Sequence, residues 1–288
     1  MRKTPLDAWI AGIIGAETLT RGGLSAWQIA RTNEAVEYAR SRSRFYRNLL
    51  GSREICLSGR DDLAGLPFTS AADIAARPMD FLSVSQERVS RIITLRSSGT
   101  TGEPKRIFFT EADQERTADF FAVGMSTLVG PGDRVLILFP CGQPGSVGEL
   151  LCRALPRIGV RPIPHGPVGD PREALEAAVK SGATSLAGTA IQAHLLCGQW
   201  RSDCRETGHG GECHQGGHAR PALMESFIRT ALLSADYVPD AVVRELREIW
   251  GCAVYGHYGM TEMGLGGGVE CEAREGYHMR EEIGRAHV

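Results

Sequence analysis

The sequence predicts an α/β protein with a mainly parallel, doubly wound sheet and flanking helices. Strand-like and helix-like segments alternate from residue 134 to residue 255, an order that is typical of parallel sheets. One of the strand-like segments, Arg134–Phe139, is an almost continuous apolar run, as expected for a strand covered on both faces. The 288 residues are enough for one large domain or two small ones.

The first eighty residues are expected to be mainly helical. Trp9–Ala16 predicts a short amphipathic helix, and Ser25–Asn48 carries apolar and aromatic side chains at helical spacing with arginines on the opposite face. Leu66–Thr69 ends this segment, and Ser70–Asp73 has the sequence of a helix start.

The alternating segments follow a further helix with its own start signal. Thr110–Asp113 resembles a capping box and opens a helix expected to run to about Leu128. Ligands of parallel sheets bind beyond the carboxyl ends of the strands, where Ser234–Tyr237 and Tyr258–Glu262 are expected to lie. The predicted strands are 134–139, 160–163, 184–187, 231–234 and 252–255, and the predicted helices are 145–158, 170–181, 191–201 and 240–250.

The composition is that of a soluble globular protein and argues against several classes of function. The formal net charge of −2 favours neither nucleic acid nor a membrane surface as a partner. Trp9–Ala16 is too short to cross a bilayer, which points to a cytoplasmic protein. The eight cysteines are scattered, so we expect reduced thiols or metal ligands.

The stretch Arg91–Thr110 places hydroxyls, glycines and a lysine between two strand-like runs, which predicts a hairpin. Backbone N–H groups and hydroxyls of its loop can surround a polyphosphate, and Lys105 adds a positive charge. The alternative is an ordinary turn rich in Ser, Thr and Gly. The stretch is not a Walker A motif, because a strand follows it where a helix should. The candidate phosphate ligands are Ser97, Ser98, Gly99, Thr100, Thr101, Gly102 and Lys105.

The loop resembles the phosphate-binding signature of the acyl-adenylate-forming superfamily, which includes acyl- and aryl-CoA ligases, luciferases and adenylation domains. Tyr258–Glu262 (YGMTE) is similar to the other nucleotide motif of that superfamily, and it follows at a fitting distance. The most similar branch is that of phenylacetate–CoA ligase. The resemblance implies the large N-terminal domain of the acyl-adenylate-forming fold. It also includes Thr4–Asp7, Phe45-Tyr46, Leu66–Thr69, Cys271 and Gly276–His278.

The resemblance implies a two-step reaction of a small carboxylic acid, expected to be aromatic. The acid attacks the α-phosphate of ATP, which gives an acyl-adenylate and pyrophosphate, and the thiol of coenzyme A then displaces AMP. Ser97–Gly102 and Lys105 would hold the β- and γ-phosphates. Thr261 would donate its hydroxyl to the α-phosphate, and Glu262 would bind Mg²⁺.

The resemblance also assigns the adenine and acyl sides of the site. Tyr258 would stack on adenine beside Gly259, and the loop with Ser234, Ala235, Asp236 and Tyr237 looks like the adenine-contacting loop. The acyl pocket is expected along Phe139–Gly142 and Gly256–Tyr258. His257 either faces this pocket or is a buried, hydrogen-bonded structural histidine.

Two groups of residues are candidate zinc ligands. Cys271 and His278 resemble a pair that, in the phenylacetate–CoA ligase branch, joins a later Cys-x-Cys to hold a structural zinc, and that later motif is absent here. The second group lies in the polar segment 202–221, whose spacing fits no structural zinc pattern and whose glycines favour a surface loop. Its members are Cys204, His209, Cys213, His214 and His218.

The expected organisation is one large domain, with a helical part at 1–90 and a nucleotide-binding α/β part at 91–281. Relatives continue with a ribose-binding Asp and a small C-terminal domain that carries a lysine for adenylation, and neither can be placed here. Residues 282–288 match one reading frame of a sequencing adapter, so we expect a non-native tail after a native sequence cut near Arg280–Glu282. Such a chain should bind adenine nucleotide weakly and form no measurable acyl-CoA.

Two other functions stay open at this point. The chain could be a non-catalytic adenine-nucleotide-binding module, or a metal-binding interaction protein that uses the loop 204–218. A homodimer is also compatible with the sequence.

Overall fold

The computed structural model describes residues 4–52, 54–95, 104–206 and 228–283. These residues pack as two compact units. The sheet unit contains residues 4–6 and 116–279, and the helical unit contains residues 7–115 and 280–283. The division at residue 90 that the sequence suggests stays a prediction.

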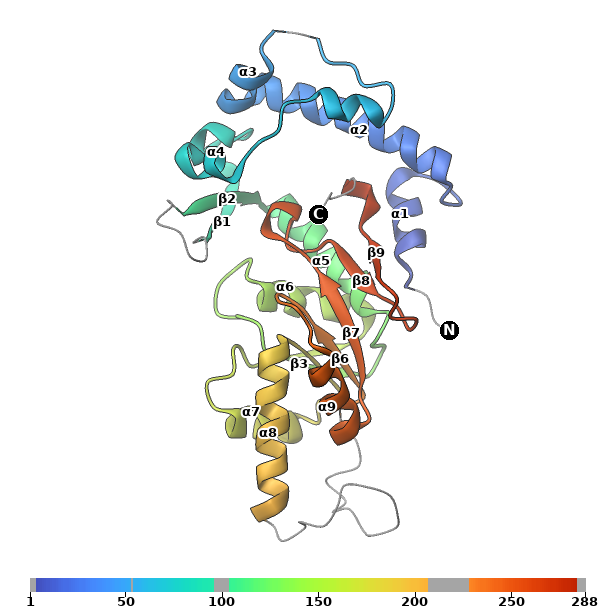
Figure 1. Ribbon diagram of the computed structural model, residues 1–288, viewed down its shortest axis with the longest axis vertical. Helices are drawn as coiled ribbons and strands as arrows, with labels where there is room; N and C mark the ends of the chain where they lie inside the picture. The colour runs from blue at the N-terminus through green and yellow to red at the C-terminus, as the bar shows by residue number, and fades with distance from the viewer. Residues whose placement is uncertain (1–3, 53, 96–103, 207–227, 284–288) are drawn as a thin grey trace. The chain divides into compact units, whose positions relative to one another are not determined.

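The sheet unit is built on one mixed sheet with the strand order β4-β3-β5-β6-β7-β8-β9 (Figure 1). The pairs that join β4, β3, β5, β6 and β7 are parallel, and the pairs β7–β8 and β8–β9 are antiparallel. The predicted α/β fold with a mainly parallel sheet is therefore confirmed. The strands are β3 (Arg134–Ile137), β4 (Arg161–Pro164), β5 (Ser185–Gly188), β6 (Thr230–Leu233), β7 (Ala253–Tyr258), β8 (Gly268–Glu270) and β9 (Tyr277–Met279).

Helices α6, α7, α8 and α9 connect the parallel strands. The connection from β3 to β4 runs in the opposite direction along the sheet to the later ones, so right-handed crossovers place α6 on one face and the other three on the opposite face. Figure 1 shows α8 on the face toward the viewer, where it packs between α7 and α9. The helices are α6 (Val147–Ala154), α7 (Pro171–Ser181), α8 (Ala190–Glu206) and α9 (Asp240–Trp250).

The core of this unit lies between the sheet and the helices α7–α9. Leu136, Leu186 and Leu233 from three strands are fully buried, and they belong to one cluster with Leu196 of α8 and Leu246 of α9. The predicted strands at 160–163, 184–187, 231–234 and 252–255 all have counterparts in this sheet, shifted by at most three residues at either end. The short antiparallel strands β8 and β9 are additions that the sequence analysis did not predict.

Local signals set several helix boundaries. At α5 (Glu111–Met125), Asp113 Oδ2 accepts from the Thr110 N–H at 2.8 Å and Thr110 Oγ1 accepts from the Asp113 N–H at 3.3 Å, so the predicted capping box is present. The predicted helix 145–158 is shorter as an α-helix, because it tightens into a 3₁₀ helix at Leu155–Ile158, where Pro156 has no N–H to donate.

The helical unit holds α1 (Leu6–Ile14), α2 (Arg21–Arg42), α3 (Arg44–Leu50) and α4 (Ala71–Ala76). The sequence predicted one helix over Ser25–Asn48, and this was wrong at Ser43. Its hydroxyl accepts from the Tyr46 N–H at 3.2 Å and donates to the Asp80 carbonyl at 2.8 Å, so it ends α2 and caps α3. The predicted helix start at Ser70 is confirmed, with a complete capping box to Asp73.

The helical unit also contains the predicted hairpin, formed by β1 (Val89–Leu95) and β2 (Lys105–Thr110). Short 3₁₀ turns occur at Asp61–Gly65, Pro78–Phe81 and Gln86–Arg88. The rings of Phe45 and Phe81 stack at 4.0 Å between centroids, which ties α3 to the second of these turns. None of the helices in the described part of the chain combines the length and apolar character needed to span a bilayer.

Candidate nucleotide site

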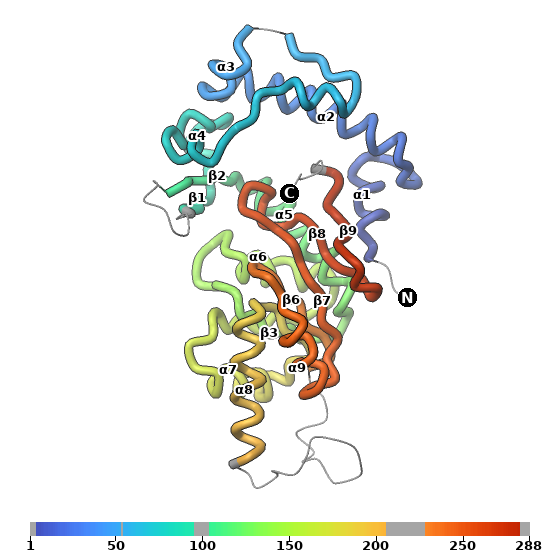
Figure 2. The backbone as a smooth tube through the Cα atoms, in the orientation of Figure 1, coloured from blue at the N-terminus to red at the C-terminus, as the bar shows by residue number. Residues whose placement is uncertain are grey.

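The two predicted nucleotide loops of the sheet unit begin at the same edge of the sheet. Strands β6 and β7 lie side by side, as the backbone trace in Figure 2 shows. They are parallel, and their register places Leu233 opposite Gly256. Ser234 follows the last residue of β6, and Tyr258 is the last residue of β7. Because both segments leave the carboxyl ends of neighbouring strands, Ser234–Tyr237 and Tyr258–Glu262 start beside each other.

A hydrogen-bonded pair, Ser234 and His257, joins these two segments. The Ser234 hydroxyl lies 2.7 Å from His257 Nδ1 and donates to the His257 carbonyl at 3.1 Å. A hydroxyl has one proton, so both contacts are satisfied when Nδ1–H donates to the serine oxygen. This assignment leaves Nε2 of His257 without a proton.

The residue His257 is partly buried, and its ring packs against aromatic side chains of the sheet unit. The rings of Phe120 and Phe121, from α5, lie 6.0 and 5.9 Å from it, measured between centroids. Nε2 is buried and has no hydrogen-bond partner among the described residues. Burial lowers the pKa of His257 to about 4, so the ring is neutral near pH 7. His257 is thus hydrogen-bonded and partly buried, and whether it also faces the acyl pocket stays a prediction.

The backbone of the Ser234–Tyr237 loop is held in an unusual conformation. Ala235 has φ = 72°, a left-handed value that is costly for a residue with a Cβ. The Ser234 N–H donates to the Gly188 carbonyl at 3.0 Å, and Asp236 Oδ1 accepts from the Tyr237 N–H at 2.7 Å. Tyr237 projects outward with 77% of its surface exposed, so the loop offers an aromatic ring to solvent.

The Tyr258–Glu262 motif continues into a tight turn that requires glycine. A Cβ on Gly259 would lie 2.2 Å from the Leu265 carbonyl oxygen and 2.9 Å from His257 Cε1. The Met260 carbonyl accepts from the N–H groups of Met263 and Leu265, which closes the 3₁₀ turn Thr261–Met263. The motif therefore has a fixed backbone.

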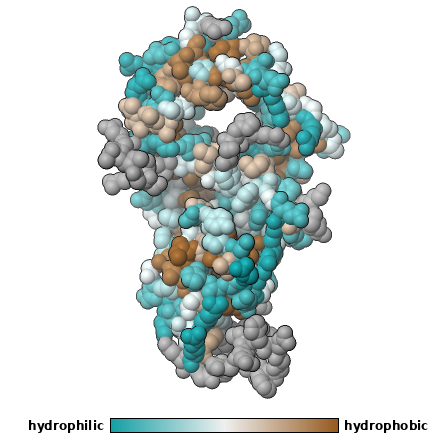
Figure 3. Space-filling model, viewed as in Figure 1, coloured by the Kyte–Doolittle hydropathy of each residue, from teal (hydrophilic) through white to brown (hydrophobic). Residues whose placement is uncertain are grey.

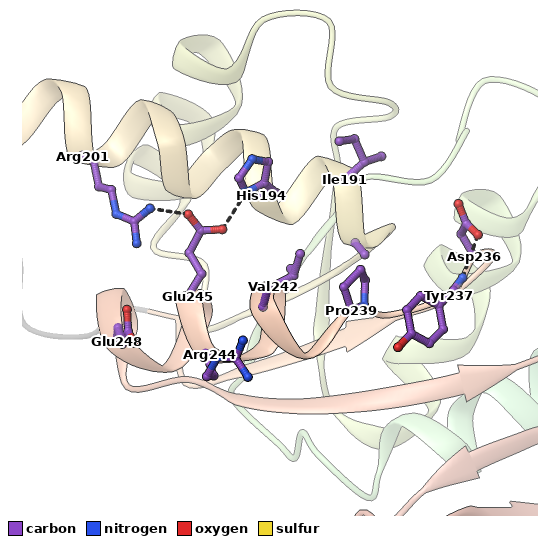
Figure 4. A pocket seen from close by; sticks show the side chains of 12 residues that line it. Ile191, His194, Arg201, Asp236, Tyr237, Pro239, Val242, Arg244, Glu245 and Glu248 are labelled. Atoms are coloured by element: carbon purple, nitrogen blue, oxygen red, sulfur yellow. Dashed lines mark hydrogen bonds and ion pairs between the residues drawn. The ribbon is translucent and has the colours of Figure 1, made fainter.

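A groove of about 580 Å³ opens next to the Ser234–Tyr237 loop, between α8 and α9 (Figure 4). The carboxylate of Glu245, which is 7% exposed, bonds to both His194 and Arg201 of α8, with 2.6 Å to His194 Nδ1. Ile191 and Leu195 are 61% and 40% exposed on the same helix, and Figure 3 shows hydrophobic side chains gathered on this face. Sequence reasoning missed this cluster, although His194 and Arg201 lie seven residues apart on one helix face.

The family of the chain follows from its match to a family model. The model that describes AMP-binding enzymes matches residues 82–287. The chain belongs to this family. No protein with a curated description matches it.

Among solved structures, this AMP-binding enzyme is similar to 2-hydroxyisobutyryl-CoA ligase in complex with 2-HIB-AMP and CoA. An open conformation of that ligase is 19% identical with a TM-score of 0.68, over 87% of this chain and 53% of the other. The same ligase in its thioesterification state is 20% identical with a TM-score of 0.69, over 90% and 54%. This similarity shows the fold of the N-terminal domain of acyl-adenylate-forming enzymes, and the chain spans about half the length of those structures.

Two side chains of the Tyr258–Glu262 motif carry groups of the kinds that bind nucleotides and Mg²⁺. Tyr258 is half-buried, and its ring lies 6.1 Å from that of Tyr277. Glu262 is exposed and supplies the hard oxygen that Mg²⁺ prefers, and a Mg²⁺ held by one carboxylate relies on substrate phosphates for further ligands. The described residues contain no group of three or more His, Cys, Asp or Glu arranged for a metal.

The remaining predicted ligands are only partly within the described residues. Ser97–Gly102 lie outside them. Lys105 is the first residue of β2 and pairs with Leu95 in the helical unit. The structure therefore does not test the phosphate loop, and its role stays a prediction.

The candidate zinc ligands do not form a complete site within the described residues. Cys271 is 5% exposed and directly follows β8, and His278 lies in β9 opposite Val269. Cys204 is half-buried near the end of α8. Within the described residues these ligands do not complete a tetrahedral zinc site, and we derive no chemistry from zinc. His209, Cys213, His214 and His218 lie outside the described residues.

Sequence reasoning also missed the environment of Gly256 in β7. Its N–H donates to Glu270 Oε2 at 2.6 Å, so the carboxylate satisfies a strand amide. Burial, and after it the charge of Glu270, raises the pKa of Tyr277. The signal was weak because Glu270 and Gly256 are brought together only by the antiparallel turn of β8.

Proposed function

We propose that this chain is the nucleotide-binding part of an AMP-forming acid–CoA ligase of the phenylacetate–CoA ligase type, acting on an aromatic carboxylic acid. The observation that carries the proposal is the joining of two nucleotide motifs by the Ser234–His257 pair at one sheet edge, in a chain of the AMP-binding enzyme family. The parallel sheet supports it, because such folds bind nucleotides at this edge. The ligands named for 2-hydroxyisobutyryl-CoA ligase, an acyl-adenylate and CoA, fit the same chemistry.

The proposed roles follow from what each side chain can supply. Tyr258 offers a ring face to adenine, and Thr261 offers a hydroxyl to the α-phosphate. Glu262 would hold Mg²⁺, and Lys105 would neutralise the outer phosphates. A general base is not required, because the acid is already ionised; the step needs charge neutralisation and in-line positioning at phosphorus.

The proposal is tested by ATP–pyrophosphate exchange with a panel of aryl acids, in parallel with AMP binding. Exchange that depends on the added acid supports a ligase. AMP binding without exchange in the complete enzyme supports the alternative, a non-catalytic nucleotide-binding module. Absence of both exchange and AMP binding would rule out the nucleotide site.

Replacing Lys105 by Ala or Glu262 by Gln is expected to slow adenylation in the complete enzyme. A hydrogen bond to a charged group contributes about 1.5–3 kcal/mol, so each change should cost about tenfold or more. Lys105→Ala should raise the KM for ATP, whereas Glu262→Gln should alter the dependence of the rate on Mg²⁺ concentration. Initial rates at several ATP and Mg²⁺ concentrations measure both effects.

Matched controls exist on the helices of the sheet unit. Lys180 and Glu176 lie on α7, away from the proposed site and from the groove between α8 and α9, so Lys180→Ala and Glu176→Gln make the same chemical changes. They should leave the rates unaltered. Wild-type rates for Lys105→Ala and Glu262→Gln would remove the two assignments.

A further inference from the structure

We propose that Ser234 and His257 act as a positioning pair that holds the adenine-contacting loop in its binding conformation. This inference rests on the proposed function, because it assigns adenine to that loop. Neither side chain is given a direct contact with the nucleotide. Their role is to fix the backbone of Ala235 and Asp236 relative to Tyr258.

The bond between Ser234 and His257 lies where the loop leaves β6. Ser234 is 9% exposed and is the only loop residue before the strained Ala235, so its side chain controls where the loop departs from β6. The bond of 2.7 Å reaches His257, which immediately precedes Tyr258. A displacement of Ser234 would therefore separate the loop from the ring proposed to stack on adenine.

The backbone of the loop is strained at Ala235. Left-handed backbone at alanine persists only where the surroundings over-determine it, and such residues gather at ligand sites. At Ser234 three contacts do this: the N–H to the Gly188 carbonyl, and the hydroxyl to the ring and to the carbonyl of His257. Without the hydroxyl contacts, the loop is free to relax toward right-handed backbone at Ala235.

The imidazole of His257 stays neutral near pH 7. Because burial among Phe120 and Phe121 disfavours the charged ring, Nδ1–H remains a neutral donor to the serine oxygen around pH 7. Asparagine has an amide nitrogen near the place of Nδ1, and glutamine has one near the place of Nε2. The two substitutions therefore separate the paired nitrogen from the unpaired one.

The experiment measures Kd for AMP and GMP by calorimetry, using the full chain and its variants. Ser234→Ala and His257→Gln are expected to weaken AMP binding by about three- to tenfold, the effect of one lost hydrogen bond. GMP binding should change less, so the preference for AMP over GMP falls. His257→Asn should restore most of that preference. A general loss of stability would weaken both nucleotides equally and would not respond to asparagine.

A matched control lies at the opposite end of β6. The Thr230 hydroxyl donates to the Ser185 hydroxyl at 2.9 Å, a bond of the same kind between β6 and its neighbour at their amino ends. Ser185→Ala should leave both Kd values unchanged. Ser234→Ala removes one oxygen and keeps the ring, so it remains informative if the His257 variants do not fold.

The outcomes separate this inference from the proposed function. If the wild-type chain binds no AMP, the proposed nucleotide site is wrong. If the wild type binds AMP and Ser234→Ala binds it equally well, the positioning role is overturned while the site stands. Equal weakening by Ser234→Ala and Ser185→Ala would also overturn it, because it would indicate general destabilisation of the sheet.

Discussion

Acidification from pH 6.5 to pH 4 is expected to destabilise the sheet unit by about 3 kcal/mol through His257 alone. Burial lowers the pKa of this histidine from 6.5 to about 4. Above pH 6.5 the ring is neutral in both states, and stability does not depend on it. Between pH 6.5 and pH 4 the His257 ring is protonated in the unfolded chain and neutral in the folded chain. Unfolding therefore becomes more favourable as the pH falls, until the pKa of the folded state is reached.

The measurement is the free energy of unfolding in urea at a series of pH values, compared between wild type and His257→Phe. Subtracting the two curves removes the carboxylates that titrate in both proteins. The hydrogen bonds from Ser70 lower the pKa of Asp73, so its stabilising contribution is lost only as the pH falls below its ordinary 3.8. The pH range in which Asp73 affects stability is therefore lower than the range in which His257 does. Parallel curves for the two proteins between pH 6.5 and pH 4 would show that His257 titrates normally.

Gly259→Ala is expected to destabilise the chain by about 1–3 kcal/mol or more, the usual cost of forcing an atom into packed structure. The new Cβ would lie 2.2 Å from the carbonyl oxygen of Leu265, which is backbone and cannot rotate away. Relief requires opening the turn, with loss of the hydrogen bond from the Gly267 N–H to the Tyr258 carbonyl at 2.9 Å. Denaturant unfolding measures the loss, and nucleotide affinity should fall with it.

Gly198→Ala in α8 makes the same substitution with the opposite expectation. No atom lies within 4 Å of a Cβ at that position, and alanine is the better helix former by about 1 kcal/mol. This variant should be slightly more stable than wild type. A Gly259→Ala protein as stable as wild type would show that the turn adapts without cost.

The sequence predicted those parts of the fold that depend on residues close together in the chain. The apolar run of Arg134–Phe139 predicted a buried strand. The capping boxes at Ser70 and Thr110 each join two residues that are three positions apart. The break at Ser43 was missed because the deciding partner, Asp80, is distant in sequence. Strands β8 and β9 have three residues each, too few to show a period.

The candidate site likewise combines features that the sequence predicts with contacts that it does not. The alternation of strands and helices predicted that Ser234 and Tyr258 lie at strand ends. It also predicted parallel strands, whose carboxyl ends lie together at one end of the sheet. The bond from Ser234 to His257 could not, since it depends on the register of β6 against β7. The contacts of the Glu245 carboxylate with His194 and Arg201 likewise require α8 and α9 to be neighbours.

The position of β7 inside the sheet determines how readily the backbone near Tyr258, at the end of β7, unfolds locally. β7 is bonded along one side by β6, and on the other by β8 and by Glu270 at the Gly256 amide. Amide hydrogens in such a strand exchange with solvent only when the whole unit opens, whereas a sheet of two strands, such as β1–β2, opens locally. We therefore expect the amide hydrogens near Tyr258 to exchange with solvent slowly, and those near Lys105 to exchange more readily.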